Sequence, residues 1–220
     1  MSPARKPPAP RASIGTSAAD IPIELFRTVR DWDRWLARHG NSAGVWMRIA
    51  KKAAELESIT YAEALDVALC HGWIDSQKQS HDAESFLQKF TPRGDRSIWS
   101  KVNRDKVEAL IASGAMKPAG LRAVERARAN GRWEQAYDSH RTSTVPDDLL
   151  AALAGNRKAR AFFATLTGAN RYAILFRIQT AVKPETRARR IEQFVAMLAR
   201  GETFHGPPKT ARRADGGARS

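Results

Sequence analysis

The sequence predicts an α+β protein that is mostly helical, with a small three-stranded antiparallel sheet and a C-terminal helical bundle unit. Three observations favour this class. Residues 44–51 alternate apolar and polar side chains, as a strand with one buried face does. Two further short strand-like segments flank a turn at residues 80–83, and the segments after residue 96 have helical spacing. Three strands packed on helices are enough for independent stability.

Helix-capping patterns open the first two helices. Thr28 with Asp31, and Thr60 with Glu63, resemble capping boxes, in which a side-chain oxygen accepts a hydrogen bond from a free backbone N–H of the first turn. Glycines follow both helices, which is typical of helix C-termini. We therefore expect helices over about 29–39 and 61–71 and strands over 44–51, 73–79 and 84–91.

The later elements are all predicted as helices. Ser97 is the expected N-cap of the first, Pro118 lies in the first turn of the second, and Pro146 begins the C-terminal unit. The expected helices are 97–113, 118–130, 146–154, 157–166, 171–182 and 185–199. The polar segment 138–145 is the predicted boundary within this region.

These elements organise the chain into four predicted regions. They are a disordered tail (1–20), an α+β domain (21–137), a basic helical unit (146–199) and a second disordered tail (200–220). The chain has one cysteine, which excludes an internal disulfide, and no apolar run near the ~18 residues of a membrane span. The first twenty residues have no apolar core of a secretory signal, so a cytoplasmic location is expected.

Positive charge is concentrated near the C-terminus. The net charge of the chain is +14, and residues 157–190 hold nine Lys or Arg against one acid, a net +8. Residues 1–13 and 200–220 carry +3 each, so residues 14–156 are close to neutral. Such a localised field favours an anionic partner, either a protein or a nucleic acid, although a solvated surface is the alternative interpretation.

Eight cations form the predicted basic surface of the C-terminal helices: Arg157, Lys158, Arg160, Arg171, Arg177, Arg187, Arg189 and Arg190. Arg187 lies one helical turn before Ile191, on the side expected to face the core. It is therefore either a side chain that extends along the core edge to reach water or an arginine directed into a groove. Arg189 and Arg190 are expected to face away from the core.

A second polar cluster lies where the last strand is followed by a helix. Its members are candidates for binding an anion or another ligand: Trp73, Asp75, Arg93, Arg96, Trp99 and Asn103. Arginines beside the free N–H groups of a helix N-terminus make a favourable anion site. The alternative is a purely structural junction, in which Asp75 pairs with one of the arginines and a serine caps the helix.

No residue pattern points to catalysis, and we expect neither a cofactor nor a metal. Cys70 and His71 are adjacent on a helix and point about 100° apart, so they cannot form a dyad. His71, Asp75, His81 and Glu84 have suitable side chains for a metal, but their spacing matches no metal motif. The signatures of nucleotide-binding loops, hydrolases and zinc proteases do not occur.

Several motifs in order resemble one family. The segments ALCHGWIDSQ (68–77), KFTPRGDRSIWSKVN (89–103), GAMKPAG (114–120), GRWEQAY (131–137) and AVKPETRARRI (181–191) are similar to the YdeI/OmpD-associated, or bacteriocin-protection, proteins. The resemblance runs from about Leu25 to Leu198. His71 departs from it, since the family usually has an aromatic residue there, and Gly94-Asp95 replace a common Arg and Pro.

The resemblance implies a bacterial protein tied to protection against bacteriocins or antimicrobial peptides and to envelope stress. It transfers no catalytic residues. The favoured hypothesis is a non-catalytic binding protein that acts through an anionic partner. One alternative is a nucleic-acid-binding protein that uses the basic helices. The other is a small-molecule enzyme with a pocket around Asp75, closed by Trp73 and Trp99.

Overall fold

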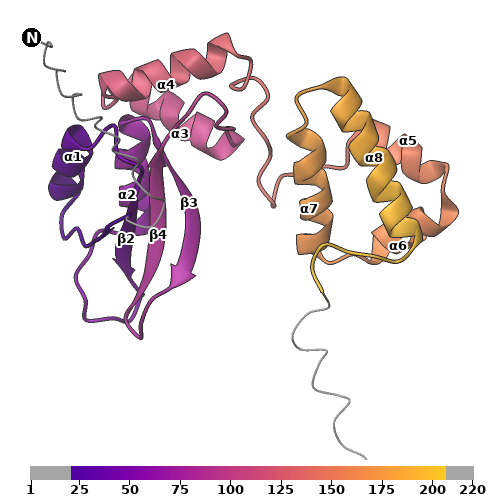
Figure 1. Cartoon of the computed structure of the whole chain (residues 1–220), viewed down its shortest axis with the longest axis horizontal. Coiled ribbons are helices and arrows are strands. Elements are labelled where there is room, and N and C mark those ends of the chain that lie inside the picture. Colours follow the sequence, from indigo (N-terminus) through magenta and orange to yellow (C-terminus); the bar gives the residue numbers. More distant parts are fainter. Residues whose placement is uncertain (1–20, 207–220) are drawn as a thin grey trace, which may run out of the picture. The chain divides into compact units, whose positions relative to one another are not determined.

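The computed structural model describes residues 21–206 (Figure 1). They divide into two compact units, residues 21–93 and 94–206. The predicted tail at 1–20, and residues 207–220 of the tail predicted at 200–220, lie outside the described residues. Eight helices and four strands within residues 21–206 confirm the α+β class. The predicted domain limits at 137 and 146 stay predictions. No helix between residues 21 and 206 has the length and apolar character needed to cross a membrane.

The first unit contains a four-stranded sheet in the order β1-β2-β4-β3. The strands are β1 (Ile23–Glu24), β2 (Val45–Ala50), β3 (Trp73–Ser80) and β4 (Ser85–Pro92). β4 pairs antiparallel with both β2 and β3, as predicted. The prediction of a three-stranded, purely antiparallel sheet is wrong in detail, because β1 adds a parallel pair with β2. A two-residue strand is too short to show any periodicity in the sequence.

α1 (Val29–Arg38) and α2 (Tyr61–Cys70) lie beside this sheet (Figure 1). Both predicted N-caps are confirmed: Thr28 accepts a hydrogen bond from the Asp31 N–H, and Thr60 and Glu63 form a complete capping box. Apolar side chains of α1 and α2 form one core with those of the strands. Its largest buried members are Trp32, Leu36, Met47, Leu69, Trp73, Leu87 and Phe90.

Gly44 is required at the start of β2 for two reasons. Its φ of +131° belongs to the backbone region that favours glycine. In addition, a Cβ at this position would lie 2.7 Å from the Phe90 carbonyl oxygen. A larger residue would push apart the β2–β4 pair at Val45 and Phe90, which begins at this point.

Asp82 closes the turn between β3 and β4. Its Oδ1 accepts hydrogen bonds from the Ser85 hydroxyl (2.7 Å), the Ser85 N–H (2.7 Å) and the Glu84 N–H (3.0 Å). Its Oδ2 accepts one from Arg48 at 2.7 Å. The Ser85 hydroxyl bond, the backbone N–H bonds and the nearby Arg48 charge together lower the pKa of Asp82 to about 2.

We expect an NMR titration of the Asp82 carboxyl to have a midpoint at about 2, against an ordinary value of 3.8. Because the folded pKa is depressed, the turn is stabilised above pH 3.8 and loses this stabilisation as the pH falls toward 2. Ser85→Ala removes the largest cause and should move the midpoint upward. A wild-type midpoint at the ordinary value would contradict the hydrogen-bonded turn.

The second unit is helical. It comprises α3 (Lys101–Ala112), α4 (Pro118–Ala129), α5 (Asp147–Ala154), α6 (Arg157–Thr165), α7 (Gly168–Gln179) and α8 (Pro184–Ala199). Two predicted starts are wrong. α3 is capped by Ser100, because Ser97 instead accepts a hydrogen bond from the Gly94 N–H. α7 begins three residues early, because Thr167 caps it through the Asn170 N–H.

α5 to α8 enclose a core of their own, as expected for a helical bundle. Its fully buried side chains include Leu149, Ile174, Ile178 and Leu198. After α8, Phe204 packs on Phe194 with ring centroids 5.4 Å apart, and His205 exchanges backbone hydrogen bonds with the Asn170 side chain. Residues 203–205 thus lie against α7 and α8.

Tyr137 and Asp138 connect α3 to α7. The Tyr137 N–H and carbonyl pair with Trp99 and Lys101, each at 2.9 Å, and its ring meets Phe176 edge-on at 4.9 Å. The Asp138 carboxylate accepts from Lys101 Nζ (2.7 Å) and from Gln179 Nε2 (2.8 Å). Its carbonyl accepts from the Tyr172 hydroxyl at 3.0 Å. Burial, with Tyr137 and Asp138 nearby, raises the pKa of Tyr172.

Candidate functional site

The six residues of the predicted ligand cluster divide between the two units. Trp73, Asp75 and Arg93 belong to the first unit, whereas Arg96, Trp99 and Asn103 belong to the second. Whether the six form one site stays a prediction.

In the first unit, Asp75 lies on β3 at the irregularity where the pairing with β4 shifts. Its Oδ2 accepts a hydrogen bond from the Tyr61 hydroxyl at 2.8 Å, which ties β3 to the start of α2. Trp73 is 1% exposed and contacts Trp32 and Trp35 edge-on. Arg93 is 6% exposed, and its N–H donates to the Gly72 carbonyl. Trp73 and Arg93 are thus part of the packed interior.

In the second unit, Trp99 is 3% exposed and packs edge-on against Trp133, with centroids 4.9 Å apart. The Asn103 N–H donates to the Ser100 hydroxyl in the cap of α3. Arg96 is exposed in the loop before this cap. The cap and the tryptophan pair fix the start of α3.

A polar pair that the sequence did not reveal joins α1 to the end of α2. His71 Nε2 lies 2.8 Å from Asp33 Oδ1, and the His71 side chain is 8% exposed. The two residues are 38 positions apart, so no local spacing points to the pair. Within residues 21–206, His, Cys, Asp and Glu side chains do not gather in threes as a metal site requires.

Arg187 of the predicted basic surface is a structural residue. Its Nε and Nη2 donate to the two oxygens of Asp148 at 2.6 and 2.9 Å, and its Nη1 donates to the Ile178 carbonyl at 3.1 Å. It therefore joins the start of α5 to the end of α7. The Arg187 hydrogen bond holds the pKa of Asp148 below its ordinary value. Neither sequence interpretation of Arg187 anticipated this pair.

Three more of these cations are engaged within the unit. Arg190 donates to the Arg177 carbonyl, so the expectation that it faces away is wrong, because the last turn of α7 offers free carbonyls. Arg177 donates to the Ala173 carbonyl and lies 4.1 Å from the Phe204 ring. Arg171 donates to the Phe163 carbonyl and lies over the ring of Phe163.

The other four cations, Arg157, Lys158, Arg160 and Arg189, are exposed. In the described part of the chain, none of their side chains takes part in an ion pair or a cation–π contact. Three of them lie in the first turns of α6, at the positive end of the helix dipole. Asn156 caps this helix through the Ala159 N–H, and its first turn contains no acidic residue. These four cations are the candidate anion-binding residues, hereafter the α6–α8 cations.

Comparison with known families divides the chain into two matched segments. Residues 24–123 match a domain of unknown function, DUF8412. Residues 142–201 match the family described as bacteriocin-protection, YdeI or OmpD-associated. No curated protein and no solved structure matches the chain.

The family match is narrower than the resemblance drawn over 25–198. Of the quoted motifs, AVKPETRARRI lies within the matched segment, whereas those between residues 68 and 120 lie in the other segment. The matched segment contains the four helices of the separate core and all of the α6–α8 cations. Residues 142–201 are therefore the part of the chain that matches the bacteriocin-protection, YdeI or OmpD-associated family.

Proposed function

We propose that this chain is a non-catalytic, cytoplasmic binding protein of bacteriocin or antimicrobial-peptide resistance and envelope stress. The α6–α8 cations bind its anionic partner. The family of residues 142–201 supports the setting. The state of the cations supports the binding role, because Arg171, Arg177, Arg187 and Arg190 are engaged in internal contacts and the α6–α8 cations are not.

The observation that carries the proposal is the charge at the start of α6. Arg157, Lys158 and Arg160 lie at the end of the helix that prefers acids, and each cation there costs roughly 0.3–1 kcal/mol. The neighbouring α5 has the favourable arrangement, with Asp147 and Asp148 in its first turn. A partner that brings negative charge to α6 offsets this cost. Binding of such a partner explains why three cations lie at this end of the helix.

The positive charge of this surface also argues against a cationic peptide as the direct partner. Bacteriocins and antimicrobial peptides that are cationic are repelled by a surface of like charge. Protection therefore acts indirectly, through an anionic protein partner rather than by capture of the peptide.

The test is a charge reversal of α6, Arg157→Glu/Lys158→Glu/Arg160→Glu. Acids at a helix N-terminus are stabilising, so this variant should remain folded and melt no lower than the wild type. Bacteria that express the wild-type chain should survive a cationic antimicrobial peptide better than bacteria without it. We expect the α6 variant to lose this advantage.

The matched control is Arg30→Glu/Arg122→Glu/Arg141→Glu, which makes the same change in net charge at three other exposed arginines. It should keep the protection. Protection that survives in the α6 variant, or is lost equally in the control, would remove the α6–α8 cations from the function.

Anisotropy with a labelled short duplex and a labelled single strand distinguishes the nucleic-acid alternative. Binding by the basic helices that persists at physiological salt, and is lost in the α6 variant, would favour it. Non-specific binding to phosphates falls steeply as salt is added. The enzyme alternative around Asp75 stays a prediction.

A further inference from the structure

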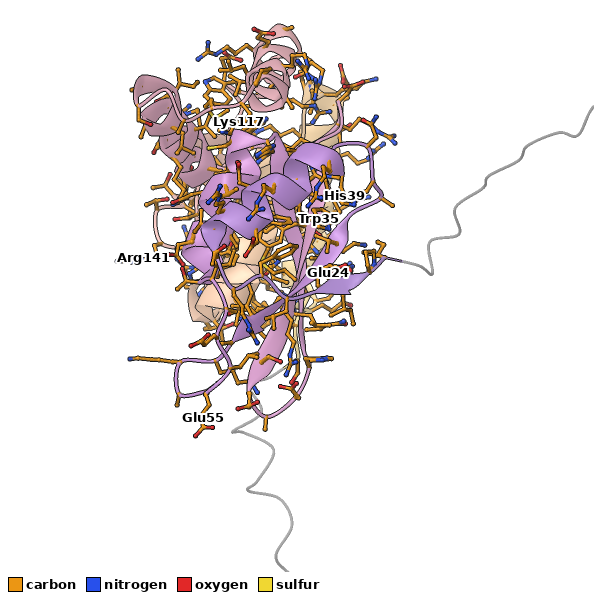
Figure 2. All side chains as sticks on the ribbon, turned by 90° about the vertical axis from the view of Figure 1, so that its left-hand side faces the viewer. Glu24, Trp35, His39, Glu55, Lys117 and Arg141 are labelled. Atoms are coloured by element: carbon orange, nitrogen blue, oxygen red, sulfur yellow. The ribbon has the colours of Figure 1, made fainter. Side chains whose placement is uncertain are left out.

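A hollow of about 370 Å³ lies on the first unit, between the segment after β1 and one side of α1. Its lining is Leu25, Phe26, Arg27, Asp31, Arg34, Trp35 and Arg38. The volume is at the lower end of the ~300–1,000 Å³ that is usual for small-ligand pockets. Figure 2 shows Trp35 on α1, with His39 following it at the end of the helix.

The charge of the lining is positive. Three arginines and one aspartate leave a net +2, and the aspartate is already engaged. Asp31 Oδ1 accepts from Arg34 at 2.9 Å, and Oδ2 accepts from the Thr28 hydroxyl at 2.7 Å. The uncompensated charge therefore belongs to Arg27 and Arg38.

Both of these arginines have donors to offer. Among the described residues the Arg27 side chain has no hydrogen-bond or ion-pair partner, and it is exposed. Arg38 uses only its Nε, which donates to the Arg34 carbonyl at 3.3 Å, so its two terminal nitrogens remain for a ligand. Guanidinium groups bind phosphate and carboxylate oxygens through paired hydrogen bonds.

The rest of the lining is apolar and held in place. Phe26 is 6% exposed and packs against Trp32 and Trp35. The Trp35 ring stacks on His39 with centroids 4.1 Å apart, and His39 Nδ1 lies 2.8 Å from the Trp35 carbonyl oxygen. These contacts fix the aromatic wall before any ligand arrives.

We propose that this hollow binds a small aromatic phosphate monoester. A phosphate monoester carries about −1.5 to −2 charges at pH 7, which matches the two uncompensated arginines. The ring of the ligand lies against Leu25, Phe26 and Trp35, and the phosphate lies between Arg27 and Arg38. The site belongs to the first unit and is independent of the α6–α8 cations.

Phenyl phosphate is the probe, and the readout is the indole N–H signal of Trp35 in a proton–nitrogen NMR spectrum of the full chain, assigned with Trp35→Phe. This local readout separates the hollow from any phosphate bound elsewhere. The signal should shift and saturate with a Kd below ~1 mM at low salt. Inorganic phosphate, which lacks the ring, and benzyl alcohol, which lacks the charge, should each bind at least about tenfold more weakly.

Arg27→Ala and Arg38→Ala should each raise the Kd for phenyl phosphate about tenfold, since each removes a charge-assisted pair of hydrogen bonds. The control is Arg30→Ala, an exposed arginine of α1 that does not line the hollow, and it should leave the Kd unchanged. The proposal is overturned by a Trp35 signal that does not saturate, by equal affinity for inorganic phosphate, or by an equal loss in the control.

Discussion

Trp32→Ala should lower the free energy of unfolding of the first unit by about 3–5 kcal/mol, the largest effect of any single substitution considered. Trp32 is 0% exposed and lies at the centre of an aromatic cluster. Its ring centroid lies 4.9 Å from that of Phe26, 5.4 Å from Trp35, 5.6 Å from Phe90 and 6.3 Å from Trp73. Trp32→Ala leaves a cavity beside these four rings. Because the rings come from different parts of the unit, they cannot all move to fill it.

The indole N–H adds a second, separable contribution. It donates to the Ala64 carbonyl of α2 at 3.0 Å, so Trp32 joins α1 to α2 as well as to the sheet. Trp32→Phe keeps an aromatic ring and removes the donor, and it should cost roughly 1–2 kcal/mol. Urea unfolding followed by near-ultraviolet circular dichroism measures both values. Equal costs for the two variants would mean that the hydrogen bond dominates over packing.

Asp138→Ala should destabilise the second unit by about 2–3 kcal/mol, because it removes two acceptors that join α3 to α7. The Asp138 side chain is 16% exposed, and Gln179 also accepts from the Asp138 N–H at 3.1 Å. Without the carboxylate, the partly buried Gln179 amide loses its acceptor. Lys101 is 46% exposed and can turn to water, so its share is the smaller one.

A double-mutant cycle separates these shares. The coupling between Asp138→Ala and Gln179→Ala should be about 1–2 kcal/mol, and the coupling between Asp138→Ala and Lys101→Ala below about 1 kcal/mol. Urea denaturation of the full chain, followed by the backbone N–H signals of α3 and α7 in proton–nitrogen NMR spectra, gives the values. A larger coupling to Lys101 would reverse the assignment.

Local signals in the sequence predicted most of the fold. Thr28, Thr60 and Glu63 act within one helical turn, so the sequence alone places their caps. The alternation of apolar and polar residues predicts β2 for the same reason, since each side chain indicates by its own polarity which face of the strand it lies on. β1 was missed because its two residues are defined only by their pairing with Trp46 and Met47, far along the chain. Ser97 and Ser100 are both good caps, and only the turn at Gly94 decides between them.

The candidate sites were harder to predict because a charged residue in the sequence does not indicate which residue it pairs with. Arg187 and Arg189 look alike in the sequence, yet Arg187 is fixed by Asp148, which lies 39 positions away, and Arg189 is exposed. The hollow at Trp35 combines α1 with the segment before it. The sequence offers Arg27, Arg34 and Arg38 at helical spacing there, but the apolar wall depends on how Phe26 packs.

The position of Tyr137 and Asp138 also bears on where this chain can be divided into fragments. Both residues lie in the interval between the two family-matched segments, and together with His140 they cover Tyr172, Phe176 and Gln179 of α7. A cut after the exposed Arg141 (Figure 2) would place these three residues on one fragment and α7 on the other. A fragment that starts at residue 142 lacks Tyr137, Asp138 and His140, so α7 loses its contacts with them. A fragment that keeps these contacts on α7 must include Tyr137, which lies upstream of the family boundary.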